Sequence, residues 1–144
     1  MLVEGLIIIL DLDKFGEFVE ERGLDPYIPN EITGYLTEAV LDFVRKWRGV
    51  VIYGLDSSRG TEEAVIEIPG FTDIEGIIRD LERIRDDVNS LGASISIVVL
   101  KDMVLAKPAN SRREAYSLTP GRRRAWKLLK SIKKRGGNRI LVLI

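Results

Sequence analysis

Two aspartates one residue apart, Asp11 and Asp13, directly follow an uninterrupted apolar run at residues 6–10. Such a run is typical of a strand buried on both faces, so these carboxylates would stand where a buried strand ends. Carboxylate oxygens are the ligands that hard cations such as Mg²⁺ prefer, and the pair therefore indicates a candidate divalent-cation site. By itself the spacing favours a simpler interpretation, in which Asp13 caps the next helix and Asp11 only ends a strand.

The turn after the aspartates consists of Lys14, Phe15 and Gly16 and leads directly into a helical pattern that Gly23 ends. The first amide groups of a helix have no partner within the helix and lie at its positive end, where phosphate binds well. Gly16 would let a ligand approach the backbone closely. The sequence therefore predicts an anion-binding turn beside the candidate cation site, a combination suited to a triphosphate.

Composition restricts the chemistry further, because the chain contains neither His nor Cys. Thiol nucleophiles, imidazole bases, disulfides and the usual zinc ligands are thereby excluded. Any catalysis has to use carboxylates, Lys, Arg, hydroxyl groups or a hard cation. The absence of Gln and the excess of Arg over Lys are compatible with a thermophilic source.

Charge is divided unevenly along the chain, although the formal net charge is zero. Residues 1–100 contain 9 Lys and Arg against 20 Asp and Glu, whereas residues 101–144 contain 13 against 2. The basic segment includes Tyr116, Trp126 and an arginine cluster at 122–124 for which the sequence identifies no partner; such a segment can bind nucleic acid. Its apolar residues at helical spacing tie it to a core, which favours a role in binding phosphate groups or offsetting the acidic site.

The elements that could position these residues follow from hydrophobic periodicity and turn signals. After the strand at 6–10 we expect, in order, helices at 14–23 and 32–49, a hairpin of strands 50–53 and 64–68, a helix at 74–92, a strand at 94–100, a helix at 120–136 and a strand at 140–144. Residues 101–117 are interpreted as an extension of the preceding strand or a loop. The order β-α-α-β-β-α-β-α-β contains the split β-α-β-β-α-β motif and predicts an α+β, ferredoxin-like fold, a mainly antiparallel sheet with helices packed on one face.

The length of 144 residues fits one domain, and we expect residues 1–144 to share a single fold. The apolar runs at 6–10 and 140–144 are far shorter than the roughly 18 to 20 residues that cross a bilayer. The chain also carries Glu4 where a secretory signal would carry basic residues. We therefore expect a cytoplasmic protein with no membrane partner.

The segment IIILDLDKFGEF resembles the first strand and turn of the superfamily that contains GGDEF domains and class III nucleotide cyclases. The same palm fold occurs in archaeal GTP cyclohydrolase III and in CRISPR-associated polymerases. Further similar segments are AVIEIPGFTDIEGIIRDLERIR, ASISIVVL and IKKRGGNRILVL, so the resemblance extends over nearly the whole chain. It implies a degenerate, cyclase-like palm with the order of elements given above.

Residue by residue, the resemblance implies that Asp11 is the first metal-binding aspartate and that the carbonyl group of Leu12 is a further ligand. The turn at residues 14–16 matches the turn whose amides hold phosphates. Lys133 matches the lysine that neutralises the terminal phosphate in diguanylate cyclases. The alternative for Lys133 is a place on the solvated face of a basic helix, near its negative end.

The hairpin tip at residues 54–63 aligns with the signature of the superfamily in two ways. Counting forward from the first strand of the hairpin makes Asp56 the second metal ligand, whereas counting back from the second strand makes it Glu62, with Glu63 as its neighbour. The tip is about six residues longer than a compact hairpin turn, which leaves both alignments open. The distance along the chain from Asp11 favours Asp56.

Three departures concern the substrate: Gly16 replaces a lysine, Val19 replaces the asparagine that reads guanine, and Gly137 replaces the first arginine of the closing signature. Residues 45–48 show no Arg-x-x-Asp product-inhibition site. A conventional diguanylate cyclase is therefore not expected.

The resulting expectation is metal-dependent binding of a nucleoside triphosphate, GTP or ATP, with Mg²⁺ or Mn²⁺ as cofactor. The activities that the resemblance allows are nucleotidyl cyclisation or transfer and a ring opening like that of GTP cyclohydrolase III. The alternatives are a catalytically inactive nucleotide sensor or homodimerisation module, and a nucleic-acid-binding domain that uses the basic C-terminal helix.

Overall fold

The elements of the computed structural model follow the expected order and add one helix. The structure describes residues 1–71 and 73–144. Its elements are β1 (Val3–Leu12), α1 (Phe15–Arg22), α2 (Glu31–Trp47), β2 (Val50–Tyr53), β3 (Glu63–Pro69), α3 (Ile74–Ser90), β4 (Ile95–Val104), α4 (Arg112–Ser117), α5 (Pro120–Lys134) and β5 (Ile140–Leu143). The additional helix is α4. It lies in the segment interpreted from sequence as a strand extension or a loop, and β4 does extend as far as Val104.

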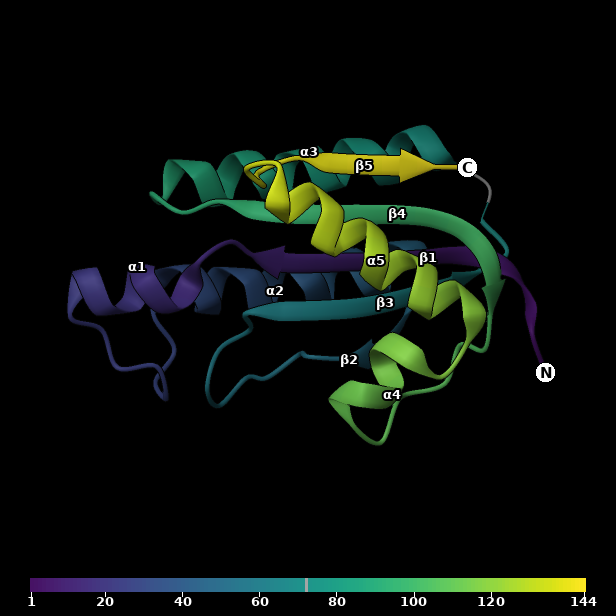
Figure 1. Cartoon of the computed structure of the whole chain (residues 1–144), viewed down its shortest axis with the longest axis horizontal. Helices are drawn as coiled ribbons and strands as arrows, with labels where there is room; N and C mark the ends of the chain where they lie inside the picture. Colours follow the sequence, from purple (N-terminus) through teal and green to yellow (C-terminus); the bar gives the residue numbers. More distant parts are fainter. Residues whose placement is uncertain (72) are drawn as a thin grey trace.

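The strands form one sheet in the order β2-β3-β1-β4-β5. Neighbouring strands are antiparallel except β4 and β5, which run parallel (Figure 1). β1 lies in the centre, and its residues 6–10 are at most 1% exposed. Burial on both faces explains why this run contains no polar residue. The predicted α+β fold with a mainly antiparallel sheet is confirmed.

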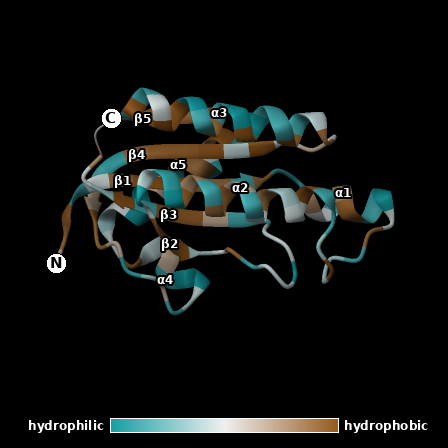
Figure 2. Cartoon of the chain, turned by 180° about the vertical axis from the view of Figure 1, so that it is seen from behind, coloured by the Kyte–Doolittle hydropathy of each residue, from teal (hydrophilic) through white to brown (hydrophobic). Residues whose placement is uncertain are grey.

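Helices cover both faces of the sheet, so the expectation of one covered face is wrong. Leu6, Ile8 and Leu10 pack in one core with α1, α2 and α3, whereas Ile7 and Ile9 form a second core with α4 and α5. In Figure 1, α5 lies in front of the strands and α2 and α3 lie behind them. Figure 2, seen from behind, shows strands that are hydrophobic along most of their length. Since side chains alternate between the faces of a strand, the apolar run at residues 6–10 of β1 requires a cover on each face.

A buried ion pair fixes α5 to β3. The side chains of Arg122 and Glu67 are both 0% exposed, with Nε of Arg122 3.0 Å from Oε2 of Glu67. The other guanidinium nitrogens donate to the carbonyl oxygens of Glu114 and Lys107, at 3.2 and 3.3 Å. Arg122 therefore does not belong to an exposed basic cluster, because its charge is compensated inside the fold.

The first turn of α5 combines a hydroxyl cap with a proline, a pattern typical of a helix start. Thr119 is the N-cap, its hydroxyl oxygen accepts a hydrogen bond from the amide of Arg122 at 3.1 Å, and Pro120 is the first helical residue. None of the helices in the two described ranges is both long enough and apolar enough to span a bilayer.

Candidate functional site

β1 ends between the beginnings of β3 and β4 and carries Asp11 to that end of the sheet. In the strand register, Asp11 lies opposite Glu63 of β3 on one side and opposite Ser96 of β4 on the other. Directly opposed side chains of an antiparallel pair share a face and have Cβ atoms about 5 Å apart. The sheet therefore brings two carboxylates, those of Asp11 and Glu63, together on the face that α4 and α5 cover.

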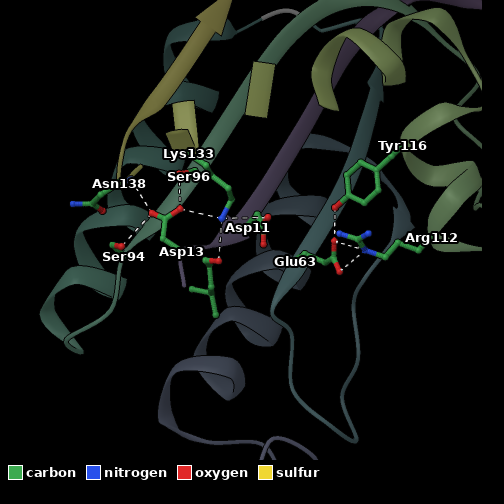
Figure 3. Close-up of polar contacts among 10 residues, drawn as sticks. Asp11, Asp13, Glu63, Ser94, Ser96, Arg112, Tyr116, Lys133 and Asn138 are labelled. Carbon is green, nitrogen blue, oxygen red and sulfur yellow. Dashed lines mark hydrogen bonds and ion pairs between the residues drawn. The ribbon is translucent and has the colours of Figure 1, made fainter. Parts of the chain in front are cut away.

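Lys133, in the last turn of α5, extends to this end of the sheet and lies between Asp11 and Asp13 (Figure 3). Its Nζ atom is 3.3 Å from Oδ2 of Asp11 and 3.0 Å from Oδ1 of Asp13. It also donates a hydrogen bond to the carbonyl oxygen of Leu12 at 3.1 Å. These contacts rule out the interpretation of Lys133 as a solvated surface residue, since only 27% of its side chain is exposed.

Asp13 is held by segments that lie far apart in the sequence. The hydroxyl groups of Ser96 and Ser94 donate to it at 2.7 and 3.1 Å, and the backbone amide of Asn138 donates at 2.7 Å. Burial acts to raise the pKa of this carboxyl group, but hydrogen bonds from Ser96, Lys133 and Asn138 outweigh it and hold the pKa below its ordinary value. Asp13 is therefore a permanent negative charge near neutral pH.

Asp13 does not cap α1, contrary to the simpler interpretation of the aspartate pair. The N-cap is Lys14, whose backbone is left-handed with φ 48°. Behind Asp13, Gly137 has φ 66°, and a Cβ atom there would lie 2.6 Å from an oxygen of Asp13. Glycine at position 137, where the superfamily has an arginine, lets the loop come close enough for the next amide to reach Asp13.

Glu63 has a cationic partner of its own, Arg112 of α4. Nε of Arg112 donates to both carboxylate oxygens, at 3.1 and 3.0 Å, and the hydroxyl group of Tyr116 donates to one of them (Figure 3). Burial and the adjacent charge of Glu63 raise the pKa of Tyr116, so the hydroxyl group stays a donor. α4, the helix that the sequence analysis did not predict, thus supplies the two side chains that hold Glu63.

The pKa of Asp11 is raised, in contrast to that of Asp13. Burial raises its pKa to about 6; attraction to Lys133 opposes this effect, and the nearby carboxylates of Glu63 and Asp13 add to it. Protonation of Asp11 therefore begins in a mildly acidic range where an ordinary aspartate is still ionised.

The turn after β1 has room for a ligand. Phe15 is buried and stacks on Phe18, with ring centroids 5.8 Å apart, which anchors the start of α1. At Gly16, an added Cβ atom would meet no atom of the described structure within 4 Å. A pocket of about 290 Å³ adjoins the turn and is lined by Lys14 and by three carboxylates, those of Asp13, Glu17 and Glu21. These features leave the predicted anion-binding turn accessible.

Asp56 lies in an exposed turn of the hairpin tip. Its Oδ1 atom accepts hydrogen bonds from the amides of Ser58 and Arg59, both at 3.0 Å, and from the hydroxyl group of Ser58 at 2.9 Å. This is the arrangement of an aspartate that stabilises its own turn. The carboxylate of Asp56 is thus engaged locally.

Glu62 contacts β1 through its backbone, since its carbonyl oxygen accepts a hydrogen bond from the amide of Leu12 at 3.0 Å. Within the described ranges, neither Glu62 nor Asp56 forms a side-chain hydrogen bond or ion pair with the Asp11 cluster. The register instead places Glu63 opposite Asp11. Strand pairing therefore adds Glu63, which the sequence analysis named only as the neighbour of Glu62, to Asp56 and Glu62 as a candidate second ligand.

The oxygen atoms at the end of β1 suit a hard cation. Asp11 and Glu63 offer carboxylates and Leu12 offers a carbonyl group. A positive charge already lies beside each carboxylate, Lys133 at Asp11 and Arg112 at Glu63. In the described part of the chain, no three or more Asp, Glu, His or Cys residues gather as a complete metal cage. Mg²⁺ is commonly held by one or two carboxylates and completed by phosphate oxygens and water, so the donor set fits that ion.

Comparison with known proteins gives a structural match. The structure of a bacterial light-regulated adenylyl cyclase superimposes with a TM-score of 0.60 and 15% sequence identity, over 93% of this chain and 72% of the other. The chain has the class III nucleotide cyclase fold. The searches find no matching protein-family model and no matching curated protein sequence. The cyclase-like palm implied by the sequence resemblance is confirmed at the level of fold.

Proposed function

We propose that this chain binds a nucleoside triphosphate together with Mg²⁺ or Mn²⁺ at the end of the sheet formed by Asp11, Leu12 and Glu63. The observation that carries the proposal is the position of Lys133, whose ammonium group contacts three oxygen atoms at the end of β1. Two of the proposed cation ligands, Asp11 and the carbonyl group of Leu12, therefore already face a positive charge, and oxygen donors of this kind suit a divalent cation. The cyclase fold supports the same class of ligand.

Each residue of the cluster has a defined role in the proposed complex. Asp11, Glu63 and the carbonyl group of Leu12 would hold the cation, which when bound neutralises phosphate charge. Lys133 would exchange its contacts with β1 for an oxygen of the terminal phosphate. The amides of residues 14–16 would donate to the remaining phosphate oxygens.

The reaction class that these groups support is transfer at the α-phosphate, as in nucleotidyl cyclisation, or release of phosphate. Lys133 and Arg112 are two side-chain cations next to the proposed phosphate position, and fixed positive charge stabilises the charge that develops on the transferred group. Neither residue reads a base, so we expect ATP and GTP to be bound with similar affinity by this part of the site.

A nucleotide-binding module without turnover is the second candidate. The observation that favours it is that both opposed carboxylates already have a side-chain cation, Lys133 at Asp11 and Arg112 at Glu63. A metal–nucleotide complex must displace Lys133 before it can use Asp11. Such a site should bind the metal together with the triphosphate more tightly than it binds the metal alone.

A polynucleotide-binding role for the basic segment is less well supported, because the arginine cluster has partners within the chain. Arg122 pairs with Glu67 in the core. Arg123 donates to the carbonyl oxygen of Ser117 at 2.8 Å, and Arg124 lies 2.7 Å from a carboxylate oxygen of Asp102.

Calorimetry with MgATP, MgGTP and magnesium tripolyphosphate tests the proposal. We expect all three to bind, and we expect Asp11→Asn to abolish the dependence on metal. Asp56→Asn is the matched control, since that carboxylate serves its own turn. The proposal is wrong if no triphosphate binds or if Asp11→Asn binds as well as the unmodified protein. Product analysis of the same mixtures with Mn²⁺ separates turnover from binding alone.

A further inference from the structure

A pocket of about 410 Å³ lies between α4 and α5, lined by Arg112, Arg113, Tyr116, Ser117 and Trp126. Two of the lining side chains, Tyr116 and Trp126, are aromatic, and their ring centroids lie 4.3 Å apart with an interplanar angle of 40°. Pockets of about 300 to 1,000 Å³ accommodate small organic ligands. None of the roles assigned above uses the ring of Trp126.

Cationic side chains surround the ring of Trp126. The guanidinium carbon of Arg112 lies 5.4 Å from its centroid, and the ammonium group of Lys130 lies 5.5 Å from it on the same helix. Half of the Arg112 side chain is exposed to solvent. A partly exposed aromatic ring with flexible cations beside it is the arrangement by which proteins stack nucleobases and hold the attached phosphates.

Two features connect the pocket with the proposed phosphate site. Tyr116 and Arg112 both contact Glu63, which lies opposite Asp11. Trp126, Lys130 and Lys133 also follow one another at intervals of four and three residues, so they share one side of α5. Seven residues of helix advance by about 10 Å, a span that suits the separation of a base from the end of its triphosphate chain.

We propose that this pocket is the base subsite of the nucleotide, in which a purine stacks on Trp126 while its phosphates extend along α5 past Lys130 to Lys133. The proposal rests on the proposed function for the phosphate end. The energy of stacking depends on the area of the base and little on the hydrogen-bonding groups at its edge. We therefore expect purines to bind more tightly than pyrimidines, with little distinction between adenine and guanine.

Tryptophan fluorescence provides the first test, because the chain contains only two tryptophans. Trp47 lies on α2, where its indole nitrogen donates to Asp80 at 2.9 Å. In the variant Trp47→Phe, Trp126 is the only indole, and MgATP should quench its emission more strongly than magnesium tripolyphosphate does. MgCTP should require a higher concentration than MgATP for the same quenching.

Calorimetry on Trp126→Leu separates the base from the phosphates. Loss of one stacked base contact should weaken MgATP binding by about tenfold and leave magnesium tripolyphosphate binding unchanged. Trp126→Phe, which keeps a smaller aromatic ring, should recover part of the loss, and Trp47→Phe should bind both ligands like the unmodified protein. A folded Trp126→Phe protein keeps the test decisive if Trp126→Leu fails to fold.

The outcomes distinguish this inference from the proposed function. Unchanged MgATP affinity in the Trp126 variants, or an equal loss for tripolyphosphate, overturns the base subsite and leaves the phosphate site standing. Quenching of Trp126 by adenosine, in a protein that binds no triphosphate, supports the subsite and refutes the proposed function. Salt-sensitive binding of a single-stranded oligonucleotide with no binding of MgATP overturns both.

Discussion

Replacing Arg122 by Met tests whether the buried ion pair holds α5, and with it Lys133, on the sheet. The substitution keeps an unbranched side chain in the core but leaves the carboxylate of Glu67, which is 0% exposed, without its guanidinium partner. Within the described residues, the amide of Ala106 would remain as its hydrogen-bond donor, at 2.8 Å.

The expected loss of stability is large. Removing one partner of a buried pair costs about 3 to 5 kcal/mol, because a charge remains buried without compensation. The guanidinium group also donates to the carbonyl oxygens of Glu114 and Lys107, and both would lose this hydrogen bond, although Glu114 keeps the one from the amide of Leu118. We expect Arg122→Met to lower the free energy of unfolding by about 4 kcal/mol, against about 5 to 15 kcal/mol for a typical domain.

Urea denaturation followed by circular dichroism measures this loss. Arg124→Met is the matched control on the same helix, because its partner is Asp102 and 61% of the Arg124 side chain is exposed, so it should cost less than about 1 kcal/mol. In a double-mutant cycle with Glu67→Gln, we expect a coupling energy of about 2 kcal/mol or more. Equal, small losses for the two arginine variants, or a coupling near zero, would refute the reasoning.

The cluster around Lys133 allows three shorter tests. Lys133→Ala should weaken MgATP binding about tenfold and MgAMP binding much less, since it acts on the terminal phosphate; equal losses by calorimetry would contradict that role. Glu63→Gln should reduce Mn²⁺ binding, seen by electron paramagnetic resonance in the presence of ATP, while Glu62→Gln should not; the reverse result would restore the alignment through Glu62. Folding raises the pKa of Asp11 from 3.8 to about 6, so the folded state keeps a proton that the unfolded state releases. As the pH rises through this interval, the protein should therefore lose up to about 3 kcal/mol of stability relative to Asp11→Asn, and parallel pH profiles in urea denaturation would exclude this.

The sequence predicted the central elements because their signals are local. β1 is buried on both faces and reads as one apolar run, and α5 begins at a hydroxyl cap followed by proline. The helix at α5 was predicted, but its place on the second face was not, because the split motif carries helices on one face only. The alternation of the apolar run in β1 demands a cover on both faces. α4 was missed although Ser111 and Glu114 have the spacing of a capping box, and both do cap the helix start.

The residue that lies opposite Asp11 in the sheet could not be predicted from sequence, because the register between strands depends on how they pair in three dimensions. The pairing of β2 with β3 shifts between Val51 and Tyr53, which upsets counting forward to Asp56. Counting back from β3 ends at Glu62, one residue from the observed partner, Glu63. Neighbouring residues of a strand point to opposite faces of the sheet, so the one-residue difference between Glu62 and Glu63 decides which side chain lies on the face of Asp11.

The contacts of Asp13 with Lys133 and Asn138 join residues 120 and 125 positions apart. Contacts of such separation form late in folding, because the intervening chain has to be ordered first. During synthesis, the end of β1 leaves the ribosome long before α5 and the turn at 136–138 exist. The nascent chain therefore carries Asp11 and Asp13 without their lysine, and the carboxylates gain it only after residue 138 has emerged and docked.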